Sequence, residues 1–478
     1  MPSIQDVSLT KVKASYPEIN REAVDALWNK VRPSFTHKIV VLDDDPTGVQ
    51  TVHGVSVYTD WSEETIEQGF LDDAQIFFIL TNSRAFTAQE TEKVHRDIAQ
   101  RVEKIAEQQD QSFIIISRGD STLRGHYPLE TEVMRETMEH KQNTVIDGEI
   151  ILPYFKEGGR LTVDNVHYVK SEDSLVPAGQ TEFAKDRTFG FTASHLGEWI
   201  EEKTNGQYKE KNVTYISLES IRERKTEEIT QQLLNVTDFN KVVVNALEEE
   251  DIKIFSIALI EAMNQGKNFL FRTAATFTKI IGDISSRPLL SKKELITEPR
   301  NNGGLIIVGS HVKKTTEQLE VLKELDSLHF IEFDVHLVLE RDAFQKEMNR
   351  VQSEAEKMVA KGVTTVVYTK RERLDLGEGM KEEELKLSVK ISDAVTSIVR
   401  NLSVRPNFLI AKGGITSSDV GTKGLQVKRA TVAGQIAPGI PVWKTGAEST
   451  FPHIPYVIFP GNVGANTTLA DVVTTLVN

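Results

Sequence analysis

The sequence predicts an α/β protein of two domains, each with a mainly parallel sheet flanked by helices. Short apolar runs of strand length alternate with charged segments of helical length along nearly the whole chain. This alternation is typical of strands joined by helical crossovers. Most of the apolar runs stop in a cluster of polar residues and glycines, as strands do where they open into turns. Since 478 residues exceed what one hydrophobic core usually organises, more than one domain is expected.

The composition narrows the class of protein. The formal charge is −14, which argues against a nucleic-acid or anionic-membrane surface, because such surfaces need a basic face. The absence of cysteine excludes disulfides, zinc thiolate sites and thiol nucleophiles. No apolar run approaches the roughly 20 residues that span a bilayer, and the N-terminus lacks the apolar core of a signal peptide. We therefore expect a cytoplasmic protein that binds neither nucleic acid nor membranes.

The chain begins with a predicted helical extension over residues 1–35. Ile19, Ala23, Leu27 and Val31 recur every four residues and predict one apolar stripe on that helix. The first domain is predicted over 36–284, with helices at 87–108 and 128–140. Its strands are predicted from runs rich in β-branched and aromatic residues at 38–42, 55–58, 74–80, 113–116, 144–152, 163–169, 213–218, 241–246 and 268–272.

A linker is predicted over residues 285–303, which are rich in Pro, Ser, Asn, Gly and charge. The second domain then spans 304–478 and repeats the pattern of strand, polar turn and helix. Its strands are predicted at 305–308, 330–334, 363–369, 408–411 and 456–459, and its helices at 315–325, at 377–402 and from 469 onward.

The turns of the first domain carry charge. Three consecutive carboxylates, 43–45, follow the first strand, and two arginines and an aspartate lie in the stretch 117–125. Adjacent carboxylates raise one another's pKa unless a cation, a metal or a ligand hydroxyl compensates. Because open α/β sheets bind ligands at the carboxyl ends of their strands, these turns predict a site for a small polyhydroxylated acid.

The turns of the second domain carry glycines and hydroxyls instead, at 309–310, 413–418 and 461–468. Glycine-rich turns that open a helix suit phosphate oxygens, so this half is predicted to hold the phosphates of a nucleotide. The sequence has no P-loop, no protein-kinase signature, no G-x-G-x-x-G fingerprint and no H-E-x-x-H. Without any family resemblance, these residues do not identify the reaction that the protein catalyses.

Seven motifs in order resemble the four-carbon acid sugar kinase family: DDDPTG (43–48), TNSR (81–84), SRGDSTLRG (117–125), EGGRLT (157–162), GSHVKKTTEQL (309–319), KGGITSSD (412–419) and PGNVG (460–464). The resemblance runs from about residue 37 to the C-terminus, and DSTLRG is its most specific part. It implies a sugar-acid domain, a nucleotide-binding domain and an active site in the cleft between them. The implied activity is ATP-dependent phosphorylation of a tetronate such as threonate, erythronate or 3-oxo-tetronate.

The site residues follow from the matching motifs. For a phosphoryl transfer we expect Asp44 or Asp45 to accept the proton of the substrate hydroxyl, with Asp120 ranked behind them. Arg84 and Arg124 would clamp the substrate carboxylate, and Mg²⁺ would accompany ATP with ligands that stay unassigned. The other substrate residues are Thr47, Gly48 and Ser121. The nucleotide residues are Ser310, Gly413, Gly414, Ile415, Thr416, Gly461, Asn462 and Gly464.

Other interpretations stay open. Lys412 either neutralises phosphate charge or is an ordinary surface lysine. Ser117 and Arg118 stand where the family often has a lysine, and the region 143–215 is longer than in many relatives. The same pockets would suit a non-catalytic sensor of sugar acids or nucleotides, whereas an isomerase or aldolase would not need the second half and an interaction scaffold would bind no ligand. The sequence leaves open whether the chain is a monomer or a homodimer.

Overall fold

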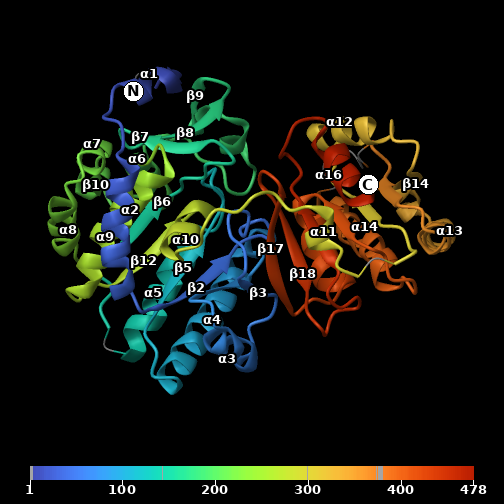
Figure 1. Ribbon diagram of the computed structural model, residues 1–478, viewed down its shortest axis with the longest axis horizontal. Coiled ribbons are helices and arrows are strands. Elements are labelled where there is room, and N and C mark those ends of the chain that lie inside the picture. Colours follow the sequence, from blue (N-terminus) through green and yellow to red (C-terminus); the bar gives the residue numbers. More distant parts are fainter. Residues whose placement is uncertain (1–3, 143, 299, 373, 375–380) are drawn as a thin grey trace. The chain divides into compact units, whose positions relative to one another are not determined.

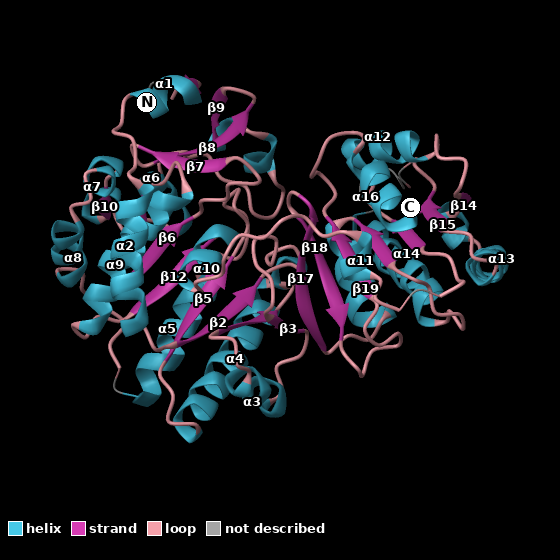
Figure 2. Cartoon of the chain, in the orientation of Figure 1, coloured by secondary structure: helices cyan, strands magenta, loops and turns pink. Residues whose placement is uncertain are grey.

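The computed structural model describes residues 4–142, 144–298, 300–372, 374 and 381–478. The chain folds into two compact units. The N-terminal unit comprises residues 1–48 and 60–285, and the C-terminal unit comprises residues 49–59 and 286–478. Each unit has a sheet with helices packed on it (Figures 1 and 2). The predicted two-domain α/β class with mainly parallel sheets is confirmed.

The sheet of the N-terminal unit is parallel at every neighbouring pair of its described strands. All residues of β2 and β4 are buried, because helices cover both faces of the sheet. Its strand order is β10 (Thr214–Ile216), β11 (Asn240–Val244), β6 (Gly148–Leu152), β12 (Phe269–Thr273), β5 (Phe113–Arg118), β2 (Lys38–Asp43) and β4 (Ile76–Leu80). The helices are α3 (Glu63–Leu71), α4 (Ala88–Gln108), α5 (Leu129–Gln142), α6 (Leu196–Lys203), α7 (Leu218–Arg222), α8 (Thr226–Leu234), α9 (Glu249–Asn264) and α10 (Ala275–Ile281).

The N-terminal extension is only partly helical. A short strand β1 (Val7–Ser8) and helix α1 (Leu9–Ala14) precede α2 (Arg21–Val31), which packs against α9. The apolar stripe predicted on this helix is wrong at two positions, because the residues after Ala23 and Leu27 are the buried ones. The buried face of α2 consists of Val24, Trp28 and Val31, while Ala23 and Leu27 flank it half-buried. The indole of Trp28 decides the face, because it enters the core and donates a hydrogen bond to Asp283 at 2.8 Å.

A second, smaller sheet lies in the N-terminal unit. It is antiparallel and has the order β1–β9–β8–β7, with β7 (Arg160–Val163), β8 (Val166–Ser171) and β9 (Ser174–Pro177). The single extended segment predicted over 163–169 is therefore wrong. The chain reverses at Asp164 and Asn165, both with positive φ, and forms a hairpin there.

The sheet of the C-terminal unit combines five parallel strands with an antiparallel edge. Its order is β3 (Ser56–Tyr58), β17 (Arg429–Ala437), β18 (Ile440–Thr445), β19 (Pro455–Phe459), β16 (Leu409–Lys412), β13 (Leu305–Val308), β15 (Thr365–Thr369) and β14 (His329–Phe333). The sequence analysis missed β17 and β18. The helices are α11 (Lys292–Leu295), α12 (Lys313–Leu322), α13 (Arg341–Ala360), α14 (Lys381–Arg400), α15 (Gly414–Asp419) and α16 (Thr468–Val477).

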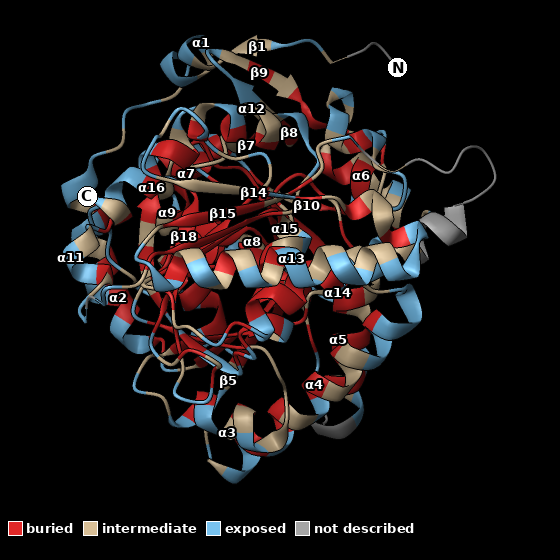
Figure 3. Cartoon of the chain, turned by 90° about the vertical axis from the view of Figure 1, so that its right-hand side faces the viewer, coloured by how far each residue is buried: buried red, intermediate tan, exposed pale blue. Residues whose placement is uncertain are grey.

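Two boundaries differ from the predicted ones. Residues 49–59 go with the C-terminal unit, because β3 pairs with β17 there. The predicted linker contains α11, and Leu295 of that helix is part of the C-terminal core. Helix α13 is exposed or half-buried over its first half, and its buried residues Val351, Ala355 and Val359 lie in the second half (Figure 3). Part of the predicted helix 377–402, residues 377–380, lies outside the described residues. Among the described helices, none combines the length and the apolar character that crossing a membrane requires.

Candidate functional site

The charged turns of the N-terminal unit meet at one edge of its sheet. Strand β2 lies between β4 and β5, and β12 pairs with β5 on the far side. All four strands run parallel, so the turns at their carboxyl ends are neighbours. The predicted residues of 43–48, Arg84 and the stretch 119–125 are thereby brought together. The sheet also brings in Arg272 from β12, which the sequence analysis did not identify.

Arginines from neighbouring turns neutralise the three consecutive carboxylates. The Arg118 guanidinium, at the end of β5, lies 3.1 Å from both Asp43 and Asp44. Arg84 lies 3.2 Å from Asp44 and also pairs with Asp45. Arg118 supplies the compensating cation that the carboxylate run requires.

The Asp43 side chain is buried, with 2% of its surface exposed. Burial raises the pKa of Asp43 to about 7, although the Arg118 guanidinium opposes the shift. A Cβ at Gly48 would lie 1.9 Å from a carboxylate oxygen of Asp43, so only glycine fits at that position. Gly48, predicted to bind substrate, therefore makes room for the Asp43 side chain.

Asp44 and Asp45 differ in how accessible they are. Asp44 has a 2% exposed side chain, and it accepts a hydrogen bond from the Asp120 N–H at 3.1 Å besides its two arginine contacts. Asp45 is 16% exposed. It accepts hydrogen bonds from the Thr47 N–H at 2.7 Å and from the Thr47 hydroxyl. Of the two predicted bases, Asp45 is the one that solvent reaches more easily.

Asp120 is held as a carboxylate. It accepts hydrogen bonds from Arg124 Nε at 2.7 Å and from the Thr122 hydroxyl, and Arg84 lies 4.0 Å away. Burial alone would raise the pKa of Asp120, but Arg124 and Arg84 outweigh it and hold the pKa well below its usual range. Asp120 is thus a poor proton acceptor and a strong hydrogen-bond acceptor for ligand hydroxyls.

The turn that carries Asp120 is held in place by packing at Leu123 and by a contact from His167. Leu123 adopts a left-handed conformation with φ of 69° and is buried against Tyr127 and Trp199. A strained residue of this kind persists when the surrounding packing determines it. The Ser121 carbonyl lies 2.8 Å from His167 Nε2. Burial lowers the pKa of His167 to about 4, so this histidine is a neutral support for the turn.

Three further residues of this site, Arg160, Phe183 and Arg272, are not among the predicted site residues. Arg272 contacts Glu130 at 3.4 Å and donates to the Arg124 carbonyl at 2.9 Å. Arg160 lies in the EGGRLT motif and begins strand β7. Phe183, in a short 3₁₀ helix (Glu182–Lys185), has the Arg124 guanidinium 5.2 Å and the Arg160 guanidinium 5.5 Å from its ring. No pattern in the sequence identifies Phe183.

The glycine-rich turns of the C-terminal unit also converge. They follow β13, β16 and β19, which are adjacent parallel strands. A cavity of about 350 Å³ opens beside two of them. Ser310, Gly413, Gly414, Ile415 and Thr416 line it, all of which were predicted to bind nucleotide. The side chain of Ile415 is 70% exposed, which leaves an apolar surface available to a ligand.

The third predicted turn is placed differently. Gly461, Asn462 and Gly464 do not line this cavity. The Gly461 carbonyl accepts hydrogen bonds from the Thr315 hydroxyl at 2.9 Å and from Lys412 Nζ at 3.1 Å. This turn therefore ties β19 to α12 and β16.

Lys412 is not a surface lysine, so that alternative is wrong. Its side chain is fully buried, and Nζ also donates to the Pro460 carbonyl at 2.5 Å. Burial lowers the pKa of Lys412 to about 7. Arg371, which the sequence analysis missed, donates hydrogen bonds to the Ser310 carbonyl and to the Thr316 hydroxyl, the latter at 2.9 Å. Through these two hydrogen bonds, Arg371 connects the turn 309–310 after β13 to helix α12.

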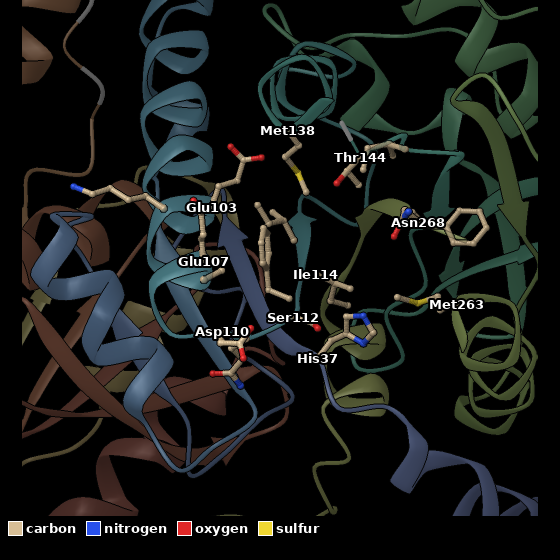
Figure 4. Close-up of a pocket in the computed structure, with 17 residues that line it drawn as sticks. His37, Glu103, Glu107, Asp110, Ser112, Ile114, Met138, Thr144, Met263 and Asn268 are labelled. Atoms are coloured by element: carbon tan, nitrogen blue, oxygen red, sulfur yellow. The ribbon is translucent and has the colours of Figure 1, made fainter. Parts of the chain in front are cut away.

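Another cavity of the N-terminal unit, of about 910 Å³, contains none of the predicted residues. It lies at the amino ends of the strands in the N-terminal unit, where His37, Glu103, Met138 and Asn268 line it (Figure 4). Ligands of open α/β sheets bind at the opposite, carboxyl edge. Its size therefore does not make it the candidate site.

Comparisons with known proteins agree with this division. Residues 39–281 match the family model of a sugar-binding N-terminal domain, and residues 305–469 match that of a nucleotide-binding C-terminal domain. No curated protein is similar in sequence.

Two crystal structures show the same fold. A Haemophilus influenzae protein of the DUF1537 family is 16% identical, with a TM-score of 0.59, and the match covers 92% of this chain and 100% of that one. A Salmonella typhimurium LT2 protein, whose name suggests a tRNA synthase, is 15% identical with a TM-score of 0.63 and coverages of 91% and 98%. With its sugar-binding and nucleotide-binding domains in this order, the chain belongs to the four-carbon acid sugar kinase family.

Proposed function

We propose that the protein is an ATP-dependent kinase that phosphorylates the terminal hydroxyl of a four-carbon sugar acid of the threonate, erythronate or 3-oxo-tetronate class. The observation that carries the proposal is the contrast between the two sites. The sugar-binding domain presents a cluster of aspartates and arginines, which suits hydroxyls and a carboxylate. The nucleotide-binding domain presents glycines and hydroxyls around a cavity, which suits phosphates.

Phosphoryl transfer depends on positioning and on neutralising charge more than on covalent chemistry. In the proposed reaction, the Asp45 carboxylate accepts the proton of the substrate hydroxyl. The hydroxyl oxygen forms the new bond to the γ-phosphorus, the bond from that phosphorus to the β-phosphate oxygen breaks, and ADP leaves. Asp45 is preferred to Asp44 because its side chain is 16% rather than 2% exposed. Asp44 acts as a positioning residue through Arg84, Arg118 and the Asp120 N–H.

The family implies Mg²⁺ with ATP. Among the described residues, no group of three or more His, Cys, Asp or Glu side chains could hold a metal ion. Magnesium often binds through substrate phosphates with few protein ligands. The hydroxyls of Ser310 and Thr416 line the cavity and fit an ion carried by the phosphates. Bound there, Mg²⁺ would neutralise charge on the transferred phosphoryl group.

Three expectations from the sequence stay predictions. They are the cytoplasmic location, the active site in the cleft between the domains, and small-molecule ligands as the partners of a monomer or a homodimer. The net charge of −14 supports the choice of small molecules over nucleic acid.

The test is a coupled ADP-release assay with Mg-ATP against D- and L-threonate, D- and L-erythronate and their 3-oxo forms. We expect acid-dependent release with one clear preference. If ATP and an acid each raised the melting temperature without ADP release, the protein would be a sensor and the kinase proposal would fail. Stabilisation by neither ligand would contradict the binding assignments as well.

A further inference from the structure

We propose that Arg160 binds the carboxylate of the sugar acid, in place of the clamp of Arg84 and Arg124 that the sequence predicts. The inference rests on the proposed function, because it names the residue that would recognise one group of that substrate.

Four of the five arginines at this edge are paired. Arg118 lies 3.1 Å from Asp43 and Asp44, and Arg84 contacts Asp44 and Asp45. Arg124 lies 2.7 Å from Asp120 and 3.7 Å from Asp186, and Arg272 lies 3.4 Å from Glu130. A substrate carboxylate at Arg84 or Arg124 would have to compete with Asp44, Asp45 or Asp120. The paired arginines are therefore poor receptors for a further anion.

Arg160 has no carboxylate partner within the described part of the chain. Its side chain comes from the start of β7, and Nη1 donates to the Gly158 carbonyl. Its Nε–H is buried without a hydrogen-bond partner. Burial lowers the pKa of Arg160, and the Asp120 carboxylate only partly opposes this shift. An unsatisfied N–H in such a place costs stability, and a carboxylate oxygen would satisfy it.

The Arg160 guanidinium lies in the same site as the predicted substrate residues. The ring of Phe183 is 5.5 Å from it and 5.2 Å from the Arg124 guanidinium, so one aromatic side chain contacts both cations. The Asp120 carboxylate and the Arg124 guanidinium both act electrostatically on Arg160. The antiparallel sheet that carries Arg160 also contacts the Asp120 turn, because His167 Nε2 of β8 lies 2.8 Å from the Ser121 carbonyl.

The backbone beside Arg160 leaves space for its guanidinium. A Cβ at Gly158 would lie 2.3 Å from Arg160 Nη1, so a side chain at 158 would displace the guanidinium. Arginine at 160 also suits a carboxylate better than lysine would, because its planar fork can donate two parallel hydrogen bonds. The geometry thus favours an acid over the polyol of the same length.

The test measures binding without turnover. Calorimetric titrations with D-threonate, D-erythronate and the polyols threitol and erythritol compare wild type, Arg160→Gln, Arg160→Lys and the control Arg187→Gln, an exposed arginine nearby. We expect Arg160→Gln to weaken acid binding by roughly 10- to 100-fold and to leave the polyol affinity unchanged. Arg160→Lys should restore part of the loss, and Arg187→Gln should match the wild type.

The outcomes separate this inference from the kinase proposal. Acid binding that Arg160→Gln abolishes, in a protein without ADP release, would uphold the inference and overturn the kinase. Acid-dependent ADP release with an unchanged KM in Arg160→Gln would do the reverse. An equal loss of acid and polyol binding together with a lower melting temperature would show a structural role only, and would overturn the inference.

Discussion

At the scale of single residues, each of the three consecutive aspartates has a distinct role. Asp43 is packed over Gly48, Asp44 is shared by two arginines and a backbone N–H, and Asp45 is the most exposed. A sequence pattern cannot rank them, because the ranking comes from Arg84 in the turn after β4 and from Arg118 at the end of β5. The three identical side chains therefore differ in exposure and in charge partners because of how the neighbouring turns pack around them.

This ranking predicts different effects for two isosteric substitutions. Asp45→Asn should lower kcat by about 10²- to 10⁴-fold, the usual cost of losing a positioned base, with little change in melting temperature. Asp44→Asn should lower the melting temperature, because the buried Arg118 and the half-buried Arg84 lose a shared carboxylate. Coupled ADP release and thermal unfolding measure the two effects. Near-normal turnover in Asp45→Asn would contradict the assignment of the base.

At the scale of elements, the turn after β16 depends on one of its two adjacent glycines. Gly413 has φ of 125°, and a Cβ there would lie 2.8 Å from the Ser310 side chain. Gly414 begins α15, and a Cβ there would meet nothing within 4 Å. The sequence shows two equal glycines, whereas the backbone gives only the first a conformation that other residues rarely adopt.

We therefore expect Gly413→Ala to destabilise the protein by about 1–3 kcal/mol and to weaken ATP binding, because the turn must shift away from Ser310. Gly414→Ala is the matched control and should change neither property appreciably. Urea unfolding and ATP titration of both variants give the comparison. Equal behaviour of the two variants would mean that the φ of Gly413 is not what holds this turn.

At the scale of the whole molecule, the C-terminal unit is built from two separated stretches of chain. Strand β3 pairs Val57 with Ala430 and Tyr58 with Arg429 of β17, and both Val57 and Tyr58 are buried. A fragment that starts at residue 286 would lack β3 and would leave the edge of β17 unpaired, which favours aggregation.

A fragment of residues 286–478 should accordingly be less stable than the same unit in the full chain. Adding a synthetic peptide of residues 49–59 should raise its melting temperature, since a ligand that binds only the folded state stabilises it. A scrambled peptide of the same composition is the control. If the true peptide had no more effect than the scrambled one, β3 would not contribute to the stability of this unit.

The sequence by itself determined the fold class, most of the strands and the charged and glycine-rich character of the turns. These follow from local patterns: apolar runs such as 113–116 form strands wherever both faces are covered, and polar turns follow them. The antiparallel hairpin of β17 and β18, the face of α2 and the membership of 49–59 depended on partners distant in sequence. The site divides in the same way. Its aspartates and glycines can be found in motifs, but the pairing of Arg84 and Arg124, the unpaired Arg160 and the burial of Lys412 were decided by tertiary structure, because charge balance and desolvation arise only when separate strands are brought together.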